Sequence, residues 1–350
     1  MIIAYAFIYT YCDTIIANID KEIPIMTLQD KLQRIDELQQ QLFGLPETPD
    51  SRFDEDFRLN FTYHSNAIEG NTLTLKETKV VLEGVTIGGK SLREHFEVIN
   101  HHEAIFFIED LVKRRQPLTE QAIKSIHQLI LKNIDDDNAG KYRTVNVLIS
   151  GAEHKPPQAF EVPSQMQDLM KWYQQNSSAL HPVIRASRLH IDFVGIHPFT
   201  DGNGRTSRLL MNLELLKNGY PAIAIKSDRK LEYYTALDTA HCTKNCDLFD
   251  NLVADYVLSE ITRKIDLLNQ QDAEFVKQLC QPDFALRKAA LQHPEISQAL
   301  LERTAIHHKC PQTRKAAAAV LQQRGIEIPT NNKPNTAPSK TVNKDKGIEI

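Results

Sequence analysis

Residues 197–208 decide the fold and read His197-Pro198-Phe199-Thr200-Asp201-Gly202-Asn203-Gly204-Arg205-Thr206-Ser207-Arg208. Apolar residues recur at helical spacing on both sides, from Val183 to Val194 upstream and from Leu209 to Leu216 downstream. The twelve residues therefore join two helices through a loop that contains two glycines. Such a loop, placed at the start of a helix, presents free backbone N–H groups and the positive end of the helix dipole to an anion.

The charged side chains of this stretch narrow the choice of anion. Arg205 and Arg208 are three positions apart and project from nearly the same helix face. Two guanidinium groups above a cluster of amides suit a polyphosphate better than a single carboxylate. Asp201 would repel phosphate directly but is a suitable ligand for Mg²⁺ that bridges phosphate oxygens. His197, at the upstream edge, can accept a proton near neutral pH.

Composition indicates an ordinary globular chain. The 350 residues are 41% hydrophobic and 25% charged, and this length favours two or three domains. The formal net charge of -4 gives no basic surface, so nucleic acid is not expected as a partner. Five cysteines, an odd number without a Cys-x-x-Cys pair, indicate reduced thiols and a cytoplasmic location.

Residues 1–26 form an apolar leader that does not match a targeting segment. No basic residue precedes the apolar run, and Asp13 interrupts it, whereas a spanning helix needs about twenty apolar residues. We interpret the leader as an artefact of a start codon placed too far upstream, with Met26 as the true start. A short membrane-associating leader is the alternative, and no membrane partner is otherwise expected.

Residues 27–134 are expected to form a series of helices. Thr27 caps an apolar-periodic segment, and a second helix is predicted from about Phe53 to Glu69. Capping-box spacing marks two further helix starts, at Thr74 with Glu77 and at Ser91 with Glu94.

Residues 135–268 combine helices with one predicted β-hairpin. The run from Val145 to Ile149 is rich in β-branched residues, and a turn-rich stretch separates it from residues 160–162. The fold class is therefore mostly α, with one β-hairpin among the helices.

The C-terminal part has its own pattern. Within residues 269–328, the pieces Leu286-Arg287-Lys288-Ala289-Ala290 and Thr313-Arg314-Lys315-Ala316-Ala317 lie 27 positions apart. This spacing predicts a small appendage of HEAT-like helical repeats. Residues 329–350 contain few apolar side chains and are expected to be a disordered tail.

The twelve-residue stretch resembles the signature of the Fic family, HPF-x-[DE]-GN-[GK]-R-x-x-R, with every specified position filled. The flanking segments AGKYRTVNVLISG and LLMNLELLKNGYP are also similar to a Fic domain, and the resemblance covers roughly residues 53–268. It extends to the animal endoplasmic-reticulum members of the family and to their bacterial relatives.

This resemblance implies an enzyme that transfers AMP from ATP to a Ser, Thr or Tyr hydroxyl of a target protein or of itself. His197 would be the general base and Asp201 the Mg²⁺ ligand. The predicted hairpin would be the flap that aligns the target segment by strand pairing. Gly204 favours AMP transfer over kinase activity, because kinase members have Lys there. The implied ATP-binding residues are Glu69, Ser150, Gly151, Asp201, Gly202, Asn203, Gly204, Arg205, Thr206, Ser207, Arg208, Tyr233 and His241. Tyr233 matches a position that stacks near adenine, and His241 replaces an Asn that contacts the nucleotide in the animal enzyme.

Residues Ser65 to Gly70 resemble the inhibitory motif of the family, [ST]-x-x-x-E-[GN]. Glu69 would lie at the end of a helix, where the helix dipole disfavours a carboxylate unless a cation faces it. Arg208 is the candidate cation. A Glu69–Arg208 pair would remove the arginine that binds the γ-phosphate, so inhibition would act within one chain.

The same sequence is compatible with two alternative functions. The resting enzyme could instead hydrolyse AMP from a modified target, with Glu69 positioning water. A function of another class is a binding module that acts through the C-terminal repeats. A homodimer is a further possible assembly, and the target protein is not identified by these motifs.

Overall fold

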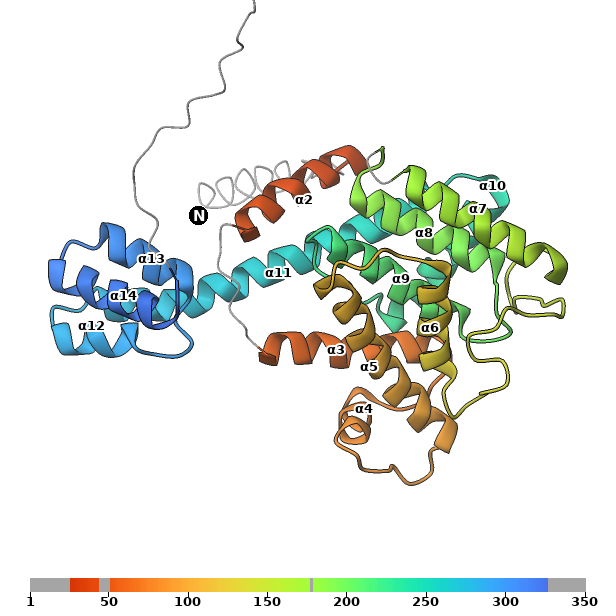
Figure 1. Cartoon of the computed structure of the whole chain (residues 1–350), viewed down its shortest axis with the longest axis horizontal. Coiled ribbons are helices and arrows are strands. Elements are labelled where there is room, and N and C mark those ends of the chain that lie inside the picture. Colours follow the sequence, from red (N-terminus) through yellow and green to blue (C-terminus); the bar gives the residue numbers. More distant parts are fainter. Residues whose placement is uncertain (1–25, 44–50, 177–178, 327–350) are drawn as a thin grey trace, which may run out of the picture. The chain divides into compact units, whose positions relative to one another are not determined.

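The computed structural model describes residues 26–43, 51–176 and 179–326. Over these residues the chain is helical and contains no strand (Figure 1). The helices are, in order, α2 Leu28–Phe43, α3 Ser51–Ile68, α4 Leu75–Leu82, α5 Leu92–Lys113, α6 Glu120–Leu131, α7 Val162–Gln175, α8 Pro182–Ile196, α9 Asn203–Lys217, α10 Lys230–Thr243, α11 Asp247–Leu279, α12 Phe284–Leu291, α13 Gln298–His307 and α14 Pro311–Gln323. Nearly all of the predicted leader, and the predicted tail, lie outside the described residues.

Local capping explains several of the helix starts. Thr74 accepts a hydrogen bond from the backbone N–H of Glu77, and the Glu77 carboxylate accepts one from the Thr74 N–H. Ser91 and Glu94 form the same reciprocal pair at the start of α5. Both predicted capping boxes are therefore confirmed, and each satisfies backbone donors that the first turn leaves free.

Helix α9 is the central element of the fold. It is buried along most of its length, as expected for a helix that is apolar on more than one face. Met211 and Leu215 belong to one hydrophobic core, whereas Leu209, Leu210 and Leu213 belong to a second. Figure 1 shows α8 beside α9, and α5 and α6 also contact α9. Packing on several sides fixes the N-terminus of α9, where the candidate site lies.

The predicted β-hairpin is not observed, which corrects the expected fold class. Residues 144–158 form turns and irregular backbone. The Arg143 guanidinium donates from Nη1 to the Val145 carbonyl at 3.0 Å and from Nη2 to the Pro157 carbonyl at 2.6 Å. Leu148 in the predicted strand is 83% exposed. A two-stranded hairpin without a packed face is only marginally stable, and here a side chain replaces the cross-strand ladder at the base of the loop.

The chain divides into two compact units, with the boundary between Leu267 and Leu268 inside α11. The second unit has its own core, which includes Leu291, Leu301 and Leu321. No helix among the described residues has the length and apolar character needed to cross a membrane.

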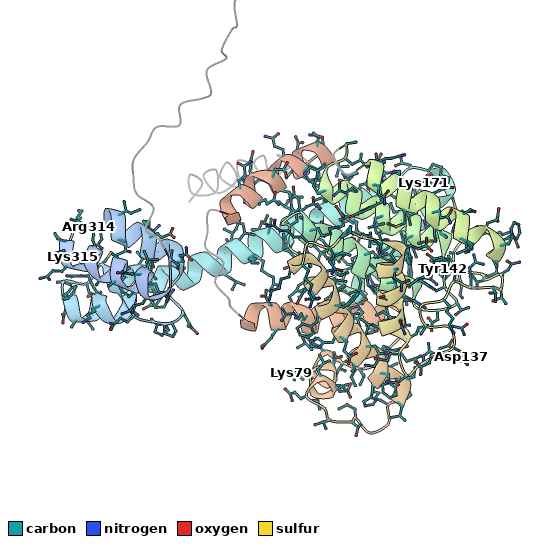
Figure 2. The ribbon with its side chains drawn as sticks, in the orientation of Figure 1. Lys79, Asp137, Tyr142, Lys171, Arg314 and Lys315 are labelled. Atoms are coloured by element: carbon teal, nitrogen blue, oxygen red, sulfur yellow. The ribbon has the colours of Figure 1, made fainter. Side chains whose placement is uncertain are left out.

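The 27-residue sequence echo has a structural counterpart in the second unit. Nη1 of Arg287 donates to the carbonyl groups of Gln281 and Pro282, and Nη1 of Arg314 donates to those of His308 and Lys309. Each arginine thus bonds to the residues six and five positions before it. Arg314 is labelled on α14 in Figure 2.

Candidate active site

The junction between α8 and α9 begins with a strained residue. His197 follows the last turn of α8 and has a φ of 51°, which places a non-glycine residue in the left-handed region. Its backbone N–H donates to the Phe193 carbonyl at 3.1 Å. Its own carbonyl accepts a hydrogen bond from Nε of Arg143 at 2.8 Å. These contacts turn the chain sharply out of α8 and hold the imidazole at the end of the helix.

The ring of His197 is arranged to act as a base. Burial lowers the pKa of His197 to about 4, so the imidazole is neutral near pH 7. Nδ1 lies 3.4 Å from the Val194 carbonyl, and because a carbonyl only accepts, this contact favours a proton on Nδ1. The lone pair of a neutral imidazole then resides on Nε2, where it can accept a proton.

Two side chains hold the loop that follows. The Asn203 amide donates to the Phe199 carbonyl and accepts from the Phe199 N–H, both at 2.9 Å. The His127 ring stacks on Phe199 with ring centres 3.6 Å apart. Nε2 of His127 donates to the Asp201 carbonyl, while its Nδ1 accepts from the Gly140 N–H. Both ring nitrogens of this neutral histidine are thus used to fix the loop.

The two glycines of the loop have different structural roles. Gly202 has a φ of 75° and caps α9, and a Cβ there would lie 3.2 Å from Ile130 and 3.3 Å from His127. Gly202 therefore meets both a conformational and a packing requirement. A Cβ at Gly204 would overlap the carboxylate of Glu69 and lie 3.2 Å from Nη1 of Arg208. The absent side chain of Gly204 thus leaves room for Glu69 at the first turn of α9.

Arg208 and Glu69 form an ion pair at this position. Oε1 of Glu69 lies 2.8 Å from Nη2 of Arg208. The guanidinium also donates from Nε to Oγ of Ser65 at 2.9 Å and from Nη2 to the Ser65 carbonyl at 2.8 Å. The Arg208 side chain is only 1% exposed, whereas that of Glu69 is 31% exposed. The end of α3 therefore covers the arginine that the sequence predicts to bind phosphate.

Arg205 points to a different set of partners. Its Nη2 lies 3.4 Å from Oδ1 of Asp201, and its Nη1 lies 3.3 Å from Oε1 of Glu97 on α5. Arg93, also on α5, donates from Nη2 to Oδ2 of Asp201. The two arginines of the signature are thus both buried but bond to different elements of the fold.

The Asp201 carboxylate is suited to hold a metal ion together with phosphate. Burial raises its pKa, but Arg205, the Gly202 N–H and Arg93 outweigh this effect and lower the pKa below its usual value. The carboxylate is therefore ionised near pH 7, and its side chain is 44% exposed. Proteins usually bind Mg²⁺ through one or two carboxylates together with phosphate oxygens, and a single accessible carboxylate beside the glycine loop at the start of α9 could serve in this way.

Ser207 and Thr206 are the remaining predicted site residues of the 197–208 stretch, and both lie in the first turns of α9. Oγ of Ser207 donates to the Gly204 carbonyl at 2.8 Å and lies 3.0 Å from Nε2 of His190. Thr206 is fully buried. Neither hydroxyl faces solvent. That of Ser207 stabilises the first turn of α9, whereas Oγ1 of Thr206 is buried without a hydrogen-bond partner among the described residues.

The other residues predicted to contact the nucleotide differ in exposure and in their hydrogen-bond partners. Tyr233 is 1% exposed, and its hydroxyl lies 3.3 Å from Nη1 of Arg208, so no ring face is open for stacking. Tyr234, the next residue, is 39% exposed. His241 bonds through Nε2 to the Ile191 carbonyl and packs against Gly195. Residues 150–151 lie on the irregular loop that replaces the predicted hairpin.

Sequence reasoning did not identify Arg93, Glu97, His127 or Arg143. Arg93 and Asp201 are separated by 108 positions, and His127 and Asp201 by 74. Such partners can be found only once the helices are placed. His127 lies among the apolar residues of α6 and therefore has the pattern of a core histidine.

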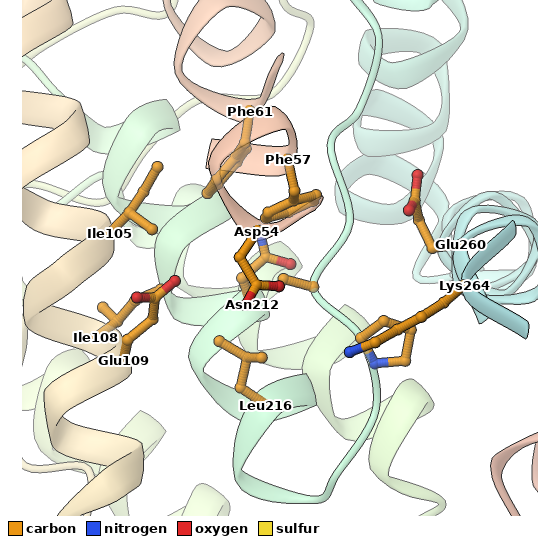
Figure 3. A pocket seen from close by; sticks show the side chains of 12 residues that line it. Asp54, Phe57, Phe61, Ile105, Ile108, Glu109, Asn212, Leu216, Glu260 and Lys264 are labelled. Carbon is orange, nitrogen blue, oxygen red and sulfur yellow. The ribbon is translucent and has the colours of Figure 1, made fainter. Parts of the chain in front are cut away.

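A separate pocket lies elsewhere on the first unit (Figure 3). It has apolar side chains such as Phe57, Phe61 and Ile105, with Glu109 and Glu260 among its charged residues. It contains no residue of the 197–208 stretch. The geometry that matches the sequence prediction is therefore the α8–α9 junction and not this pocket.

Two known structures resemble about two thirds of this chain. Fic-1 from Caenorhabditis elegans (residues 134–508) is 32% identical, with 69% of this chain and 73% of that one covered and a TM-score of 0.63. A Fic-domain signalling protein from Bacteroides thetaiotaomicron is 30% identical, with 66% and 94% covered and a TM-score of 0.60.

Sequence comparison also finds Fic proteins. A protein named protein adenylyltransferase Fic from Nematostella vectensis is 37% identical over 218 residues, which are 61% of this chain and 51% of that protein. The chain thus spans about half the length of this curated relative. The model of the Fic/DOC family matches residues 117–215, which include the complete α8–α9 junction. Together with the structural matches, this shows that the chain belongs to the Fic/DOC family.

Proposed function

We propose that this chain is a protein adenylyltransferase that transfers AMP from ATP to a hydroxyl group of a target protein. The observation that carries this proposal is the α8–α9 junction, where a neutral His197 stands at the edge of a glycine loop that opens α9. The names of the similar animal proteins support the same activity. Auto-modification is the simplest case, because it needs no further protein.

The proposed reaction uses His197 as the general base. The hydroxyl oxygen of the target attacks the α-phosphorus of ATP, and the hydroxyl proton passes to Nε2 of His197. The bond between the α-phosphorus and the bridging oxygen breaks, and pyrophosphate leaves. A base that is neutral at the working pH is ready to accept this proton, and that requirement matches the lowered pKa of His197.

The start of α9 would bind the phosphates. The backbone N–H groups of Gly202, Asn203 and Gly204 lie at the positive end of the helix dipole. Arg205 and Arg208 would neutralise the outer phosphates once their present partners are released. Asp201 would hold Mg²⁺, which supplies charge neutralisation of the phosphate oxygens when it is bound. Tyr234 is partly exposed, so it is a better candidate than the buried Tyr233 to stack against the adenine ring of ATP.

We further propose that Glu69 inhibits the enzyme within the same chain. Arg208 has almost no accessible surface while Ser65 and Glu69 bond to it, so it cannot reach a γ-phosphate in this state. Glu69 also occupies the space above Gly204 at the first turn of α9. A carboxylate in that place competes with the phosphate for the same cation and for the same end of the helix.

The reaction type can be tested with labelled ATP. A label on the α-phosphate should appear on protein, because AMP is the transferred group, while a label on the γ-phosphate should leave with pyrophosphate. The measurement is the protein-bound label after incubation with each nucleotide. Transfer of the γ-label instead would identify a kinase and would reject the proposed orientation of ATP.

The reverse reaction is a second candidate function. The charge of Glu69 acts on the His197 imidazole and raises its pKa, although burial has the larger, opposite effect. A carboxylate whose charge acts on the proposed base could orient a water molecule for hydrolysis of a modified target. Loss of Glu69 should then abolish release of AMP from pre-modified protein while increasing its transfer.

A further inference from the structure

Four charged side chains around Asp201 form a closed ring. Nη2 of Arg93 lies 2.5 Å from Oδ2 of Asp201, and Nη2 of Arg205 lies 3.4 Å from Oδ1. Oε1 of Glu97 completes the ring, at 3.2 Å from Nε of Arg93 and 3.3 Å from Nη1 of Arg205. Positive and negative groups alternate, so each carboxylate faces two guanidinium groups.

The two arginines of this ring differ in how readily they can leave. Arg205 is 2% exposed and belongs to the buried helix α9, so it cannot move into water without disturbing the core. The Arg93 side chain is 56% exposed, and the Asp201 side chain is 44% exposed. Only Arg93 can therefore exchange its contact with Asp201 for water.

We propose that Arg93 competes with Mg²⁺ for the Asp201 carboxylate. This inference rests on the proposed role of Asp201 as the metal ligand. Arg93 neutralises Asp201 in the metal-free enzyme and would give up this contact when Mg²⁺ binds with the nucleotide, because a guanidinium group and Mg²⁺ at the same carboxylate would repel each other. Arg93 is thus a positioning residue that raises the Mg²⁺ concentration needed for nucleotide binding.

A direct contact of Arg93 with phosphate is the rival explanation, and it makes a different prediction. A phosphate ligand strengthens nucleotide binding equally with and without metal. A competitor of the metal favours nucleotide binding only in the absence of metal, where it neutralises Asp201, and it therefore reduces the gain in affinity that Mg²⁺ brings. The coupling factor is the ratio by which Mg²⁺ strengthens nucleotide binding. Loss of Arg93 changes this factor if Arg93 competes with the metal, and leaves it unchanged if Arg93 binds phosphate.

The experiment compares the full chain with its Arg93→Gln and Arg93→Lys variants. ADP affinity is measured by calorimetry in EDTA and again in excess Mg²⁺. ADP suits this purpose because it lacks the phosphate that Arg208 is proposed to bind. Arg93→Gln should weaken ADP binding in EDTA, because Asp201 is then no longer neutralised. Its ADP affinity in Mg²⁺ should not fall by the same factor, so the Mg²⁺ coupling factor should increase about two- to fivefold, the range expected for a partly exposed charge pair. Arg93→Lys retains the charge and should stay near the parent.

Arg114→Gln is the matched control, because Arg114 also adjoins α5 and forms a partly exposed ion pair, with Asp110. Its coupling factor should equal that of the parent. An unchanged factor in Arg93→Gln, or an equal loss of ADP affinity with and without Mg²⁺, would overturn the inference. If Mg²⁺ does not strengthen ADP binding even in the parent, the proposed role of Asp201 fails and the inference fails with it.

Discussion

Glu69 and Arg208 are 139 positions apart in the sequence, yet their side chains are joined by a hydrogen bond of 2.8 Å. The glutamate lies just beyond α3, and the arginine lies on the first turns of α9. The contact thus links the N-terminal helices to the start of α9. Because Arg208 is buried and Glu69 is partly exposed, Glu69 is the partner that can move.

Removal of the Glu69 carboxylate should activate the enzyme. In Glu69→Gly, Arg208 loses its ion-pair partner and the space above Gly204 opens, so auto-modification with AMP should rise strongly. A charge-assisted contact of about 2 kcal/mol corresponds to more than a tenfold change. The measurement is the initial rate of α-label incorporation. Glu83→Gly is a matched control, because Glu83 also follows a helix and precedes a left-handed glycine, Gly84.

Arg208 should behave as the target of this inhibition. Arg208→Ala should be inactive, and the double variant with Glu69→Gly should be equally inactive, because the released arginine no longer exists. Such non-additivity distinguishes a specific pair from a general loosening of the helix. A double variant as active as Glu69→Gly alone would contradict the inhibitory role of the pair.

His197 should be required for chemistry and not for nucleotide affinity. His197→Ala should reduce AMP transfer by roughly 10²- to 10⁴-fold, the usual contribution of a general base, while ATP affinity stays near that of the parent. Because burial lowers the pKa of His197 to about 4, transfer should be lost only as the pH falls towards that value. A rate that instead halves near the ordinary histidine pKa of about 6.5 would indicate a different base.

Gly202 should tolerate no side chain. Gly202→Ala must adopt a φ of 75° and also contact Ile130 and His127, so the loop should shift and ATP affinity should fall. Gly84→Ala is the control, because Gly84 has a φ of 87° but open space around it. Both variants should lose about 1 kcal/mol of folding free energy from backbone strain, but only Gly202→Ala should lose additional stability and nucleotide affinity. Urea unfolding and calorimetry would measure the two effects, and equal losses in both variants would reject the packing role.

The C-terminal unit should contribute to target choice and not to catalysis. Deletion from Asp272 onward removes the residues of its separate core and leaves both cores around α9 intact. Auto-modification should therefore persist, while modification of the native target should decline. Circular dichroism of the truncated chain serves as the control for folding. An unfolded product would mean that this unit belongs to the catalytic core.

Local signals in the sequence predict the helix starts and the loop well. Capping by Thr74 and Ser91 depends on residues only three positions away, and the Gly202 turn depends on its own backbone conformation. Such features need no knowledge of tertiary structure.

Features that depend on distant partners are predicted less well. The β-branched run from Val145 to Ile149 predicts a hairpin, but Val145 and Leu148 are exposed, and Arg143 bonds to the carbonyl groups of Val145 and Pro157 instead. The burial of Tyr233 and the partners of Arg205 follow from how α5, α9 and α10 pack. Neighbouring residues in the sequence carry no information on these contacts.

The guanidinium of Arg143 binds the His197 carbonyl and both ends of the irregular loop. Its anchors are main-chain carbonyl groups, which are present whatever side chains the loop carries. Residues between the two anchor points can therefore be exchanged without loss of the bonds that hold the histidine. Under the proposed activity, exchanges in this loop would alter the surface that it offers to a target protein, while the position of His197 would stay the same.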